Sequence, residues 1–266
     1  MKNPFFAPRY ILLVLGFLGT LLIGYFYVLP RAAEWMASKV SIGTERKMGD
    51  AAYAALQAVE DSAGTSLITD FYDALAISTP YEIRIVMVRD TALNAFALPG
   101  GQIVVNSGLV KKMQSYPELA ALLAHETIHV QERHATRSLF RSMGSQLVIH
   151  FLFGDMGSVV STAAIQAEEI RSLSYSRKLE KEADLKGLLL LTKRSIDAQG
   201  FIDLLNHLRA EDGQLVLPEF ISSHPDIASR ISYIRQAARG QSASGDTTLK
   251  SIFEKLKKHI YDHYHY

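Results

Sequence analysis

The sequence predicts a mainly α-helical α+β fold with a small β-sheet, preceded by one transmembrane helix. Apolar residues recur at helical spacing in much of the chain, whereas strand-like segments are confined to residues 81–106. An uncharged apolar run over residues 10–29 precedes both. We expect an anchor over residues 1–30, a globular domain over residues 31–240, and a flexible joint with a C-terminal tail over residues 241–266.

The composition excludes several kinds of function. The 266 residues carry a formal net charge of +1, so the chain has no general basic field and we expect no nucleic-acid partner. The absence of cysteine excludes disulfides and cysteine-ligated metal sites. Any metal ion must therefore be held by histidine and carboxylate side chains.

The apolar run of residues 10–29 has the length of a membrane-spanning helix. About 20 residues match a hydrocarbon core of ~30 Å, whereas a cleavable signal has an apolar region of only about 7–15 residues. We therefore expect a retained single-pass anchor, with cations on both sides that leave its orientation undecided. Gly16, Thr20 and Gly24 share one stripe that would suit a homo-oligomer formed through the anchor, although ordinary small residues of a membrane helix are the simpler explanation.

The strand-like segments form a hairpin and one further strand. Residues 81–88 alternate as a half-buried strand does, and residues 94–98 and 102–106 flank a Pro-Gly-Gly turn. Directly afterwards, Ser115, Pro117 and Glu118 mark the start of a helix that should carry residues 125–134.

Other segments are expected to be helical or remain open. Helical spacing covers residues 32–60, 70–76, 174–193, 201–210 and 226–238. The apolar segment 147–165, mixed with glycine and serine, could be a second membrane pass, an interfacial segment, a mobile cover or a buried hairpin.

The segment from His125 to His129, with Glu126 beside the first histidine, indicates a metal site with a general base next to it. Histidines four residues apart project from one face of a helix, so both can bind one metal ion. Glu126 can then act as general base toward a metal-activated water that attacks a peptide carbonyl. Chance supplies this motif in roughly one or two such chains per hundred, so its position on a capped helix after a hairpin is what supports it.

A third ligand must come from elsewhere in the chain. A third histidine ten residues after the first would be at position 135, but that residue is Ala135. His134 is nine residues after His125, so on a continuous helix it should face almost the opposite way. In the helix near residue 180, Glu180 and Asp184 share an apolar stripe, whereas Glu182 lies on a charged one. Two carboxylates on an apolar face are costly unless they are paired or bind metal, so Glu180 is the predicted ligand.

Asp184 and Arg177 complete the expected surroundings of Glu180. Asp184 could accept the second ring proton of a ligating histidine and fix its orientation. The alternative for Glu180 is a buried salt bridge with Arg177 or Arg171, and Arg177 is counted with Asp184 among the residues around the ligands.

The ordered motifs resemble those of peptidase family M48. The motifs lie in residues 94–101, 125–134, 175–184 and 224–225, and the resemblance covers roughly residues 40–238. It implies a gluzincin (zincin-like) fold, one Zn²⁺ per chain and Glu180 as the third zinc ligand. The similarity is greatest to family members that have a single membrane anchor.

The resemblance also implies roles for two further groups of residues. Asn94, Ala95, Phe96 and Ala97 are expected to form an active-site edge strand that pairs with an extended substrate, with Asn94 as a substrate contact. His224 is expected either to stabilise the oxyanion or to occupy the open zinc position in a latent state.

The expected function is a membrane-anchored zinc endopeptidase (EC 3.4.24 type) with polypeptide substrates. The resemblance implies a catalytic domain on the non-cytoplasmic side, in a periplasm or intermembrane space, and a role in quality control of membrane or envelope proteins. The alternative is a chaperone or assembly factor that binds polypeptides with a protease-like fold and does not cut them. A purely structural zinc site is disfavoured, because such sites fill all four positions and need no glutamate beside a ligand.

Overall fold

The computed structural model describes residues 6–24, 28–142, 157, 160–162, 171, 175–210, 219–241 and 243–264. Most of these residues are helical and the described strands form one three-stranded sheet, so the prediction of a mainly helical α+β fold is confirmed. The segment 147–165, for which several structures were left open, lies outside the described residues except for 157 and 160–162.

The sheet is built from β1 (Arg84–Val88), β2 (Ala95–Ala97) and β3 (Gln102–Asn106) in the order β1-β3-β2. β3 pairs in parallel with β1 and antiparallel with β2, where Phe96 lies opposite Val104. The turn between β2 and β3 needs glycine, since Gly100 has φ +81° and a Cβ there would lie 2.2 Å from the Arg46 backbone nitrogen. The predicted hairpin is confirmed.

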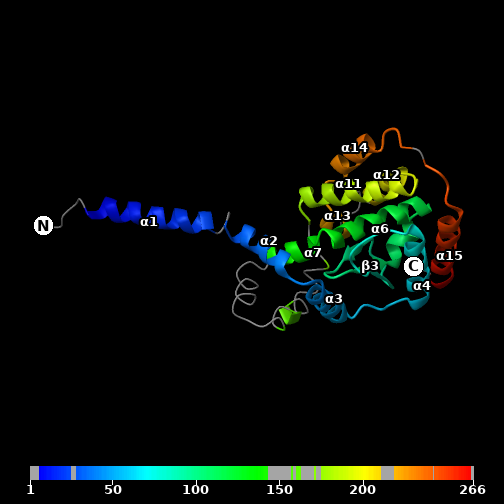
Figure 1. The fold of residues 1–266 in the computed structure, drawn as a ribbon, viewed down its shortest axis with the longest axis horizontal. Coiled ribbons are helices and arrows are strands. Elements are labelled where there is room, and N and C mark those ends of the chain that lie inside the picture. Colours follow the sequence, from blue (N-terminus) through cyan, green and yellow to red (C-terminus); the bar gives the residue numbers. More distant parts are fainter. Residues whose placement is uncertain are drawn as a thin grey trace.

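Helices pack around this sheet, whereas α1 extends away from it (Figure 1). The helices are α1 (Phe6–Ile23), α2 (Leu29–Lys39), α3 (Ile42–Leu56), α4 (Ser62–Leu75), α5 (Ser107–Lys112), α6 (Tyr116–Gln131), α7 (His134–Ser142), α11 (Arg177–Lys193), α12 (Gln199–Ala210), α13 (Glu219–Ser223), α14 (Ile227–Ala237) and α15 (Thr247–His263). α6 is the central helix, since it contacts α11 and α12 as well as β2 and β3 (Figure 1).

Close packing of α6 and α11 brings the motif residues together. Every residue of α6 from Glu118 to Val130 is buried, which is expected of a helix that is covered on all sides. A Cβ at Gly187 of α11 would lie only 3.3 Å from the His125 backbone nitrogen, so this glycine lets the two helices approach.

The prediction that one continuous helix carries residues 125–134 is wrong. α6 ends at Gln131, Arg133 adopts a left-handed conformation with φ +58°, and α7 begins at His134. The turn is held by contacts from distant parts of the chain: Arg133 Nε donates to Glu45 Oε1 at 3.0 Å and Arg133 Nη2 to the Val40 carbonyl at 2.6 Å. Helical periodicity cannot reveal such tertiary contacts.

The N-terminal helix differs from the prediction. Within the described part of the chain, no helix is long and apolar enough to cross a membrane, so a spanning helix over residues 10–29 is not confirmed. α1 includes Arg9 and ends at Ile23.

The C-terminal tail expected after the flexible joint is not a solvated appendage over residues 247–264. These residues include α15, which packs along α4 (Figure 1) and buries Leu249, Phe253, Leu256 and Ile260. Asp61, just before α4, accepts hydrogen bonds from His259 Nε2 at 2.7 Å and from the Tyr264 hydroxyl at 2.6 Å. α15 is therefore part of the domain core.

Candidate metal centre

Two helices and the residue after α13 bring four side chains together in the core. α6 supplies His125 and His129, α11 supplies Glu180, and His224 follows α13. One ligand-type atom from each residue lies within 4.8 Å of those of the others. The Nε2 atoms of His125 and His129 are 2.9 Å apart, and His224 Nδ1 is 3.0 Å from Glu180 Oε1.

This group of four, here called the metal group, fits a divalent metal ion. Its members are at most 2% exposed. Three imidazoles and one carboxylate form a donor set that suits zinc. Glu126 beside the group is fully buried, and neither of its carboxylate oxygens has a hydrogen-bond partner among the described residues. An unsatisfied buried polar group costs about 1–3 kcal/mol, so such groups indicate a site built for a ligand.

Asp184 lies behind the first histidine of the metal group. Its Oδ1 is 2.9 Å from His125 Nδ1, the ring nitrogen that faces away from the group. Burial alone would raise the pKa of Asp184. The Arg230 guanidinium and His125 nevertheless hold this pKa well below its ordinary range. Asp184 is therefore an anion that can fix the orientation of His125.

Arg230 of α14 is a site residue that sequence reasoning missed. It is 2% exposed, and its Nε and Nη2 each lie 2.8 Å from an Asp184 oxygen. Its Nη1 lies 2.9 Å from Glu180 Oε2 and donates to the His224 carbonyl at 3.2 Å. The signal was the position of Arg230 on the stripe of buried α14 residues that also includes Ile227, Ile231 and Ile234.

Arg177 lies outside the metal group. Its side chain is 82% exposed and its Nε is 3.3 Å from Asp226 Oδ2. Arg171, the other arginine considered for Glu180, is 3.3 Å from Asp90. The salt bridge of Glu180 is made with Arg230 instead, because α14 rather than the start of α11 covers this face of Glu180.

Glu126 is placed to exchange protons beside the metal group. Its Oε1 is 3.8 Å from His224 Nε2, and burial raises the pKa of its carboxyl group. A carboxylate with a raised pKa is a more effective general base near neutral pH than an ordinary one. Its position at the side of the histidine face is the one expected from the motif.

His134 is not a member of the metal group, in agreement with its exclusion as a ligand, but its expected orientation is wrong. The turn at Arg133 directs its ring back, so that His134 Nδ1 lies 3.0 Å from His129 Nδ1. On the other side, Tyr175 stacks on His129 with ring centroids 4.1 Å apart.

β2 lies next to this centre but is covered. It is an edge strand of the sheet, as expected, yet Asn94, Ala95, Phe96 and Ala97 are at most 4% exposed. The preceding Leu93 carbonyl accepts from the Phe220 backbone N–H at 3.1 Å, and the Phe220 ring stacks on His224 at 4.3 Å. The side-chain amide atoms of Asn94 have no partner among the described residues. Substrate could pair with β2 only after this face is uncovered.

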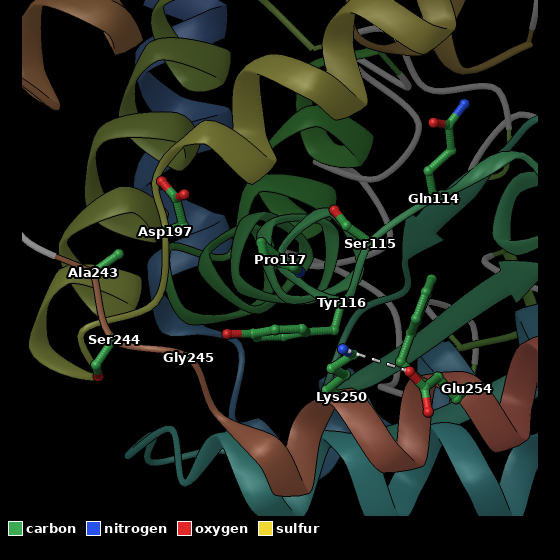
Figure 2. A pocket seen from close by; sticks show the side chains of 11 residues that line it. Gln114, Ser115, Tyr116, Pro117, Asp197, Ala243, Ser244, Gly245, Lys250 and Glu254 are labelled. Carbon is green, nitrogen blue, oxygen red and sulfur yellow. Dashed lines mark ion pairs between the residues drawn. The ribbon is translucent and has the colours of Figure 1, made fainter.

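A hollow of about 530 Å³ lies at the other end of α6 (Figure 2). Tyr116 and Pro117 line one side, and Lys250 and Glu254 of α15 line another. No member of the metal group borders it. This hollow is therefore separate from the metal group.

Two histidines on one helix, a glutamate from a second helix and an adjacent buried glutamate define a metal-dependent hydrolase centre. The sequence profile of peptidase family M48 matches residues 62–238, and the chain belongs to this family. Membership makes it a metallopeptidase-family protein, and the family implies a metal ion.

Several proteases are similar to the chain in sequence. The beta-barrel assembly-enhancing protease of Yersinia pestis is 28% identical over 234 residues, which cover 79% of this chain and 47% of that protein. The mitochondrial metalloendopeptidase OMA1 of Arabidopsis thaliana is 31% identical over 158 residues, covering 58% of this chain and 31% of the relative. The human OMA1 metalloendopeptidase is 31% identical over 161 residues, covering 56% and 31%. The chain thus matches less than half the length of these relatives.

Proposed function

We propose that this protein is a zinc endopeptidase that hydrolyses peptide bonds in polypeptide substrates. The observation that carries the proposal is the buried metal group with Glu126 beside it, whose carboxylate has no hydrogen-bond partner among the described residues. Zinc held by His125, His129 and Glu180 would supply acidification of a water molecule and polarisation of the substrate carbonyl. The relatives named as proteases and metalloendopeptidases support this choice of reaction.

The protein's own residues would move the proton and hold the ligands. Glu126 takes a proton from water at a carboxylate oxygen as the water oxygen bonds to the carbonyl carbon. It then delivers this proton to the amide nitrogen as the carbon–nitrogen bond breaks. Arg230 and Asp184 keep Glu180 and His125 in place, because each contacts one of the two ligands directly.

We further propose that the described arrangement is a latent state held by His224. The His224 ring lies 3.0 Å from Glu180 and 3.3 Å from His125 Nε2, so it stands where a fourth donor would stand. All four side chains are buried, so a polypeptide backbone could reach them only after a rearrangement. This supports the inhibitory role over the oxyanion-stabilising one.

Metal analysis and proteolysis test the function. Purified wild type should contain about one zinc per chain and cut an unfolded polypeptide such as casein. Glu126→Gln should keep the zinc and lose at least ~100-fold in cleavage rate, since proton transfer contributes about 10²–10⁴-fold. Glu254→Gln, at a glutamate whose side chain is 64% exposed, is the matched control and should cleave normally.

Two results would reject the proposal. Undetectable zinc in active protein would remove the metal site. If the biological effect of the protein survives Glu126→Gln in full, the alternative of a polypeptide-binding chaperone or assembly factor takes its place.

We also propose that α1 attaches the protein to a membrane, with the catalytic domain on the non-cytoplasmic side. The support is the exposure of large apolar side chains, for instance 68% for Leu12, 69% for Leu13 and 63% for Phe17. Carbonate extraction should leave the wild type with the membrane pellet and release a Leu13→Glu/Phe17→Glu variant. Release of both proteins would contradict attachment.

Two further proposals concern the substrates and self-association. By analogy with the relative named for β-barrel assembly, we propose misassembled membrane or envelope proteins as substrates. A homo-oligomer through the stripe of Gly16, Thr20 and Gly24 remains a prediction. Crosslinking in membranes that yields only monomers would remove it.

A further inference from the structure

His134 is a buried histidine that the proposed reaction does not use. It is 0% exposed, and its Nδ1 lies 3.0 Å from Nδ1 of His129. The other nitrogen of His129 points into the metal group, where its Nε2 is 2.9 Å from His125 Nε2 and 3.5 Å from Glu180 Oε1. His134 therefore contacts a metal ligand from behind.

The contact between the two Nδ1 atoms requires one proton between them. A neutral imidazole has one N–H and one lone pair. If His134 donated this proton, neutral His129 would carry its own proton on Nε2, and the nitrogen facing the metal group would have no lone pair for a metal. If His129 donates from Nδ1, its Nε2 is left with the lone pair that a ligand needs. Only the second arrangement permits metal binding.

We infer that His134 is a positioning residue, which accepts the Nδ1 proton of His129 and so fixes the tautomer and ring orientation of the second metal ligand. His134 then carries its own proton on Nε2, which lies 3.5 Å from Glu182 Oε2. Glu182 is held in turn by Lys186 Nζ at 2.7 Å. The charged stripe of α11 thus supports the centre from its outer side.

His134 does for His129, as a neutral side chain, what the Asp184 carboxylate does for His125. Asp184 Oδ1 lies 2.9 Å from His125 Nδ1, so each ligating ring has a partner on the nitrogen that faces away from the metal group. The left-handed turn at Arg133 makes this possible, since a continuous helix would direct residue 134 away from residue 129. The break in the helix therefore has a use at the metal centre.

Zinc affinity of two full-length variants tests the inference, which rests on the proposed zinc site. His134→Asn places an acceptor oxygen near the former Nδ1, whereas His134→Phe fills the ring volume without an acceptor. Competition with a chromogenic chelator should show zinc affinity about 10–100-fold weaker in His134→Phe and close to wild type in His134→Asn. The reverse ranking would mean that His134 only fills space and would overturn the inference.

Nitrogen NMR of the imidazoles reads the tautomer of His129 directly in the wild-type protein, so this test does not depend on the folding of a variant. In both the metal-free and the zinc-loaded protein, His129 should carry its proton on Nδ1 and a lone pair on Nε2. A proton on His129 Nε2 overturns the inference. A wild type that binds no zinc defeats the proposed function instead, and the tautomer of the metal-free protein still decides the role of His134.

Discussion

Replacing Arg230 with methionine should destabilise the metal-free protein strongly. The guanidinium lies 2.8 Å from both oxygens of Asp184 and 2.9 Å from Glu180, and all three side chains are at most 3% exposed. Methionine fills the aliphatic volume but leaves two buried carboxylates without their cation. Removing one partner of a buried ion pair costs about 3–5 kcal/mol, and with two carboxylates we expect the upper part of this range.

Urea unfolding at pH 7, followed by circular dichroism, measures this loss. Arg235→Met is the matched control on the same helix, because Arg235 is exposed and should change the free energy of unfolding by less than ~0.5 kcal/mol. Arg230→Lys keeps the charge but loses the two-pronged contact, so it should fall between wild type and Arg230→Met. It also remains measurable if Arg230→Met does not fold.

Bound zinc should reduce the loss of unfolding free energy in Arg230→Met, because the metal cation compensates the charge of Glu180 in place of the guanidinium. The difference between wild type and Arg230→Met should therefore be smaller in zinc-saturated protein than after chelation. A metal-free Arg230→Met protein within ~1 kcal/mol of wild type would refute the reasoning, because the two carboxylates would then not depend on Arg230.

Three further outcomes are expected. His224→Ala should raise the rate of casein cleavage if His224 holds a latent state, and a lower rate would favour the oxyanion role. Burial and Glu45 raise the pKa of Tyr81 to about 12 from its ordinary 10, so the stability from this group is present below pH 10 and is lost as pH rises through 12. At ~1.4 kcal/mol per pKa unit the loss is at most about 3 kcal/mol, and Tyr81→Phe should give a flatter profile in alkaline unfolding curves. Phe253→Ala in α15 should cost about 3–5 kcal/mol in urea unfolding, whereas the exposed Lys255→Ala should cost less than ~0.5 kcal/mol, and equal values would contradict the burial of α15.

The parts of the centre that could be predicted from the sequence are those set by local geometry. Two histidines four residues apart share a helix face whatever the rest of the fold does, and helical stripes separate Glu180 from Glu182. The structure brings Glu180 to the two histidines and leaves Glu182 27% exposed at the edge. The glycines of the β2–β3 turn are equally local, since they follow from backbone conformation.

The rest depends on contacts between distant residues. The turn at Arg133 is stabilised by Glu45, 88 positions away, and no local pattern indicates it. Arg230 reaches Asp184 across 46 positions, although an arginine on an apolar stripe was a usable signal. The packing of α15 was readable as well, since Leu249, Phe253, Leu256 and Ile260 recur at helical spacing.

The hydrogen bonds around His224 limit how the proposed latent state would open. Its backbone N–H donates to the Phe220 carbonyl at 2.8 Å, and its own carbonyl accepts from Arg230 at 3.2 Å. Displacing the whole residue would break both bonds and disturb the pairing of Arg230 with the carboxylates. Rotation of the imidazole alone breaks only its ring contacts, which include Glu180 and the stacked Phe220 ring at 4.3 Å.

Release by side-chain rotation predicts a specific effect of the stacking partner. Phe220→Leu removes the aromatic stack and keeps an apolar side chain, so it should raise the rate of casein cleavage without loss of zinc. The increase in rate should be smaller than in His224→Ala, because the contact of His224 with Glu180 remains. A Phe220→Leu/His224→Ala double variant should cleave no faster than His224→Ala alone. Independent, additive increases would show that Phe220 acts elsewhere, for instance through the Leu93 carbonyl beside β2.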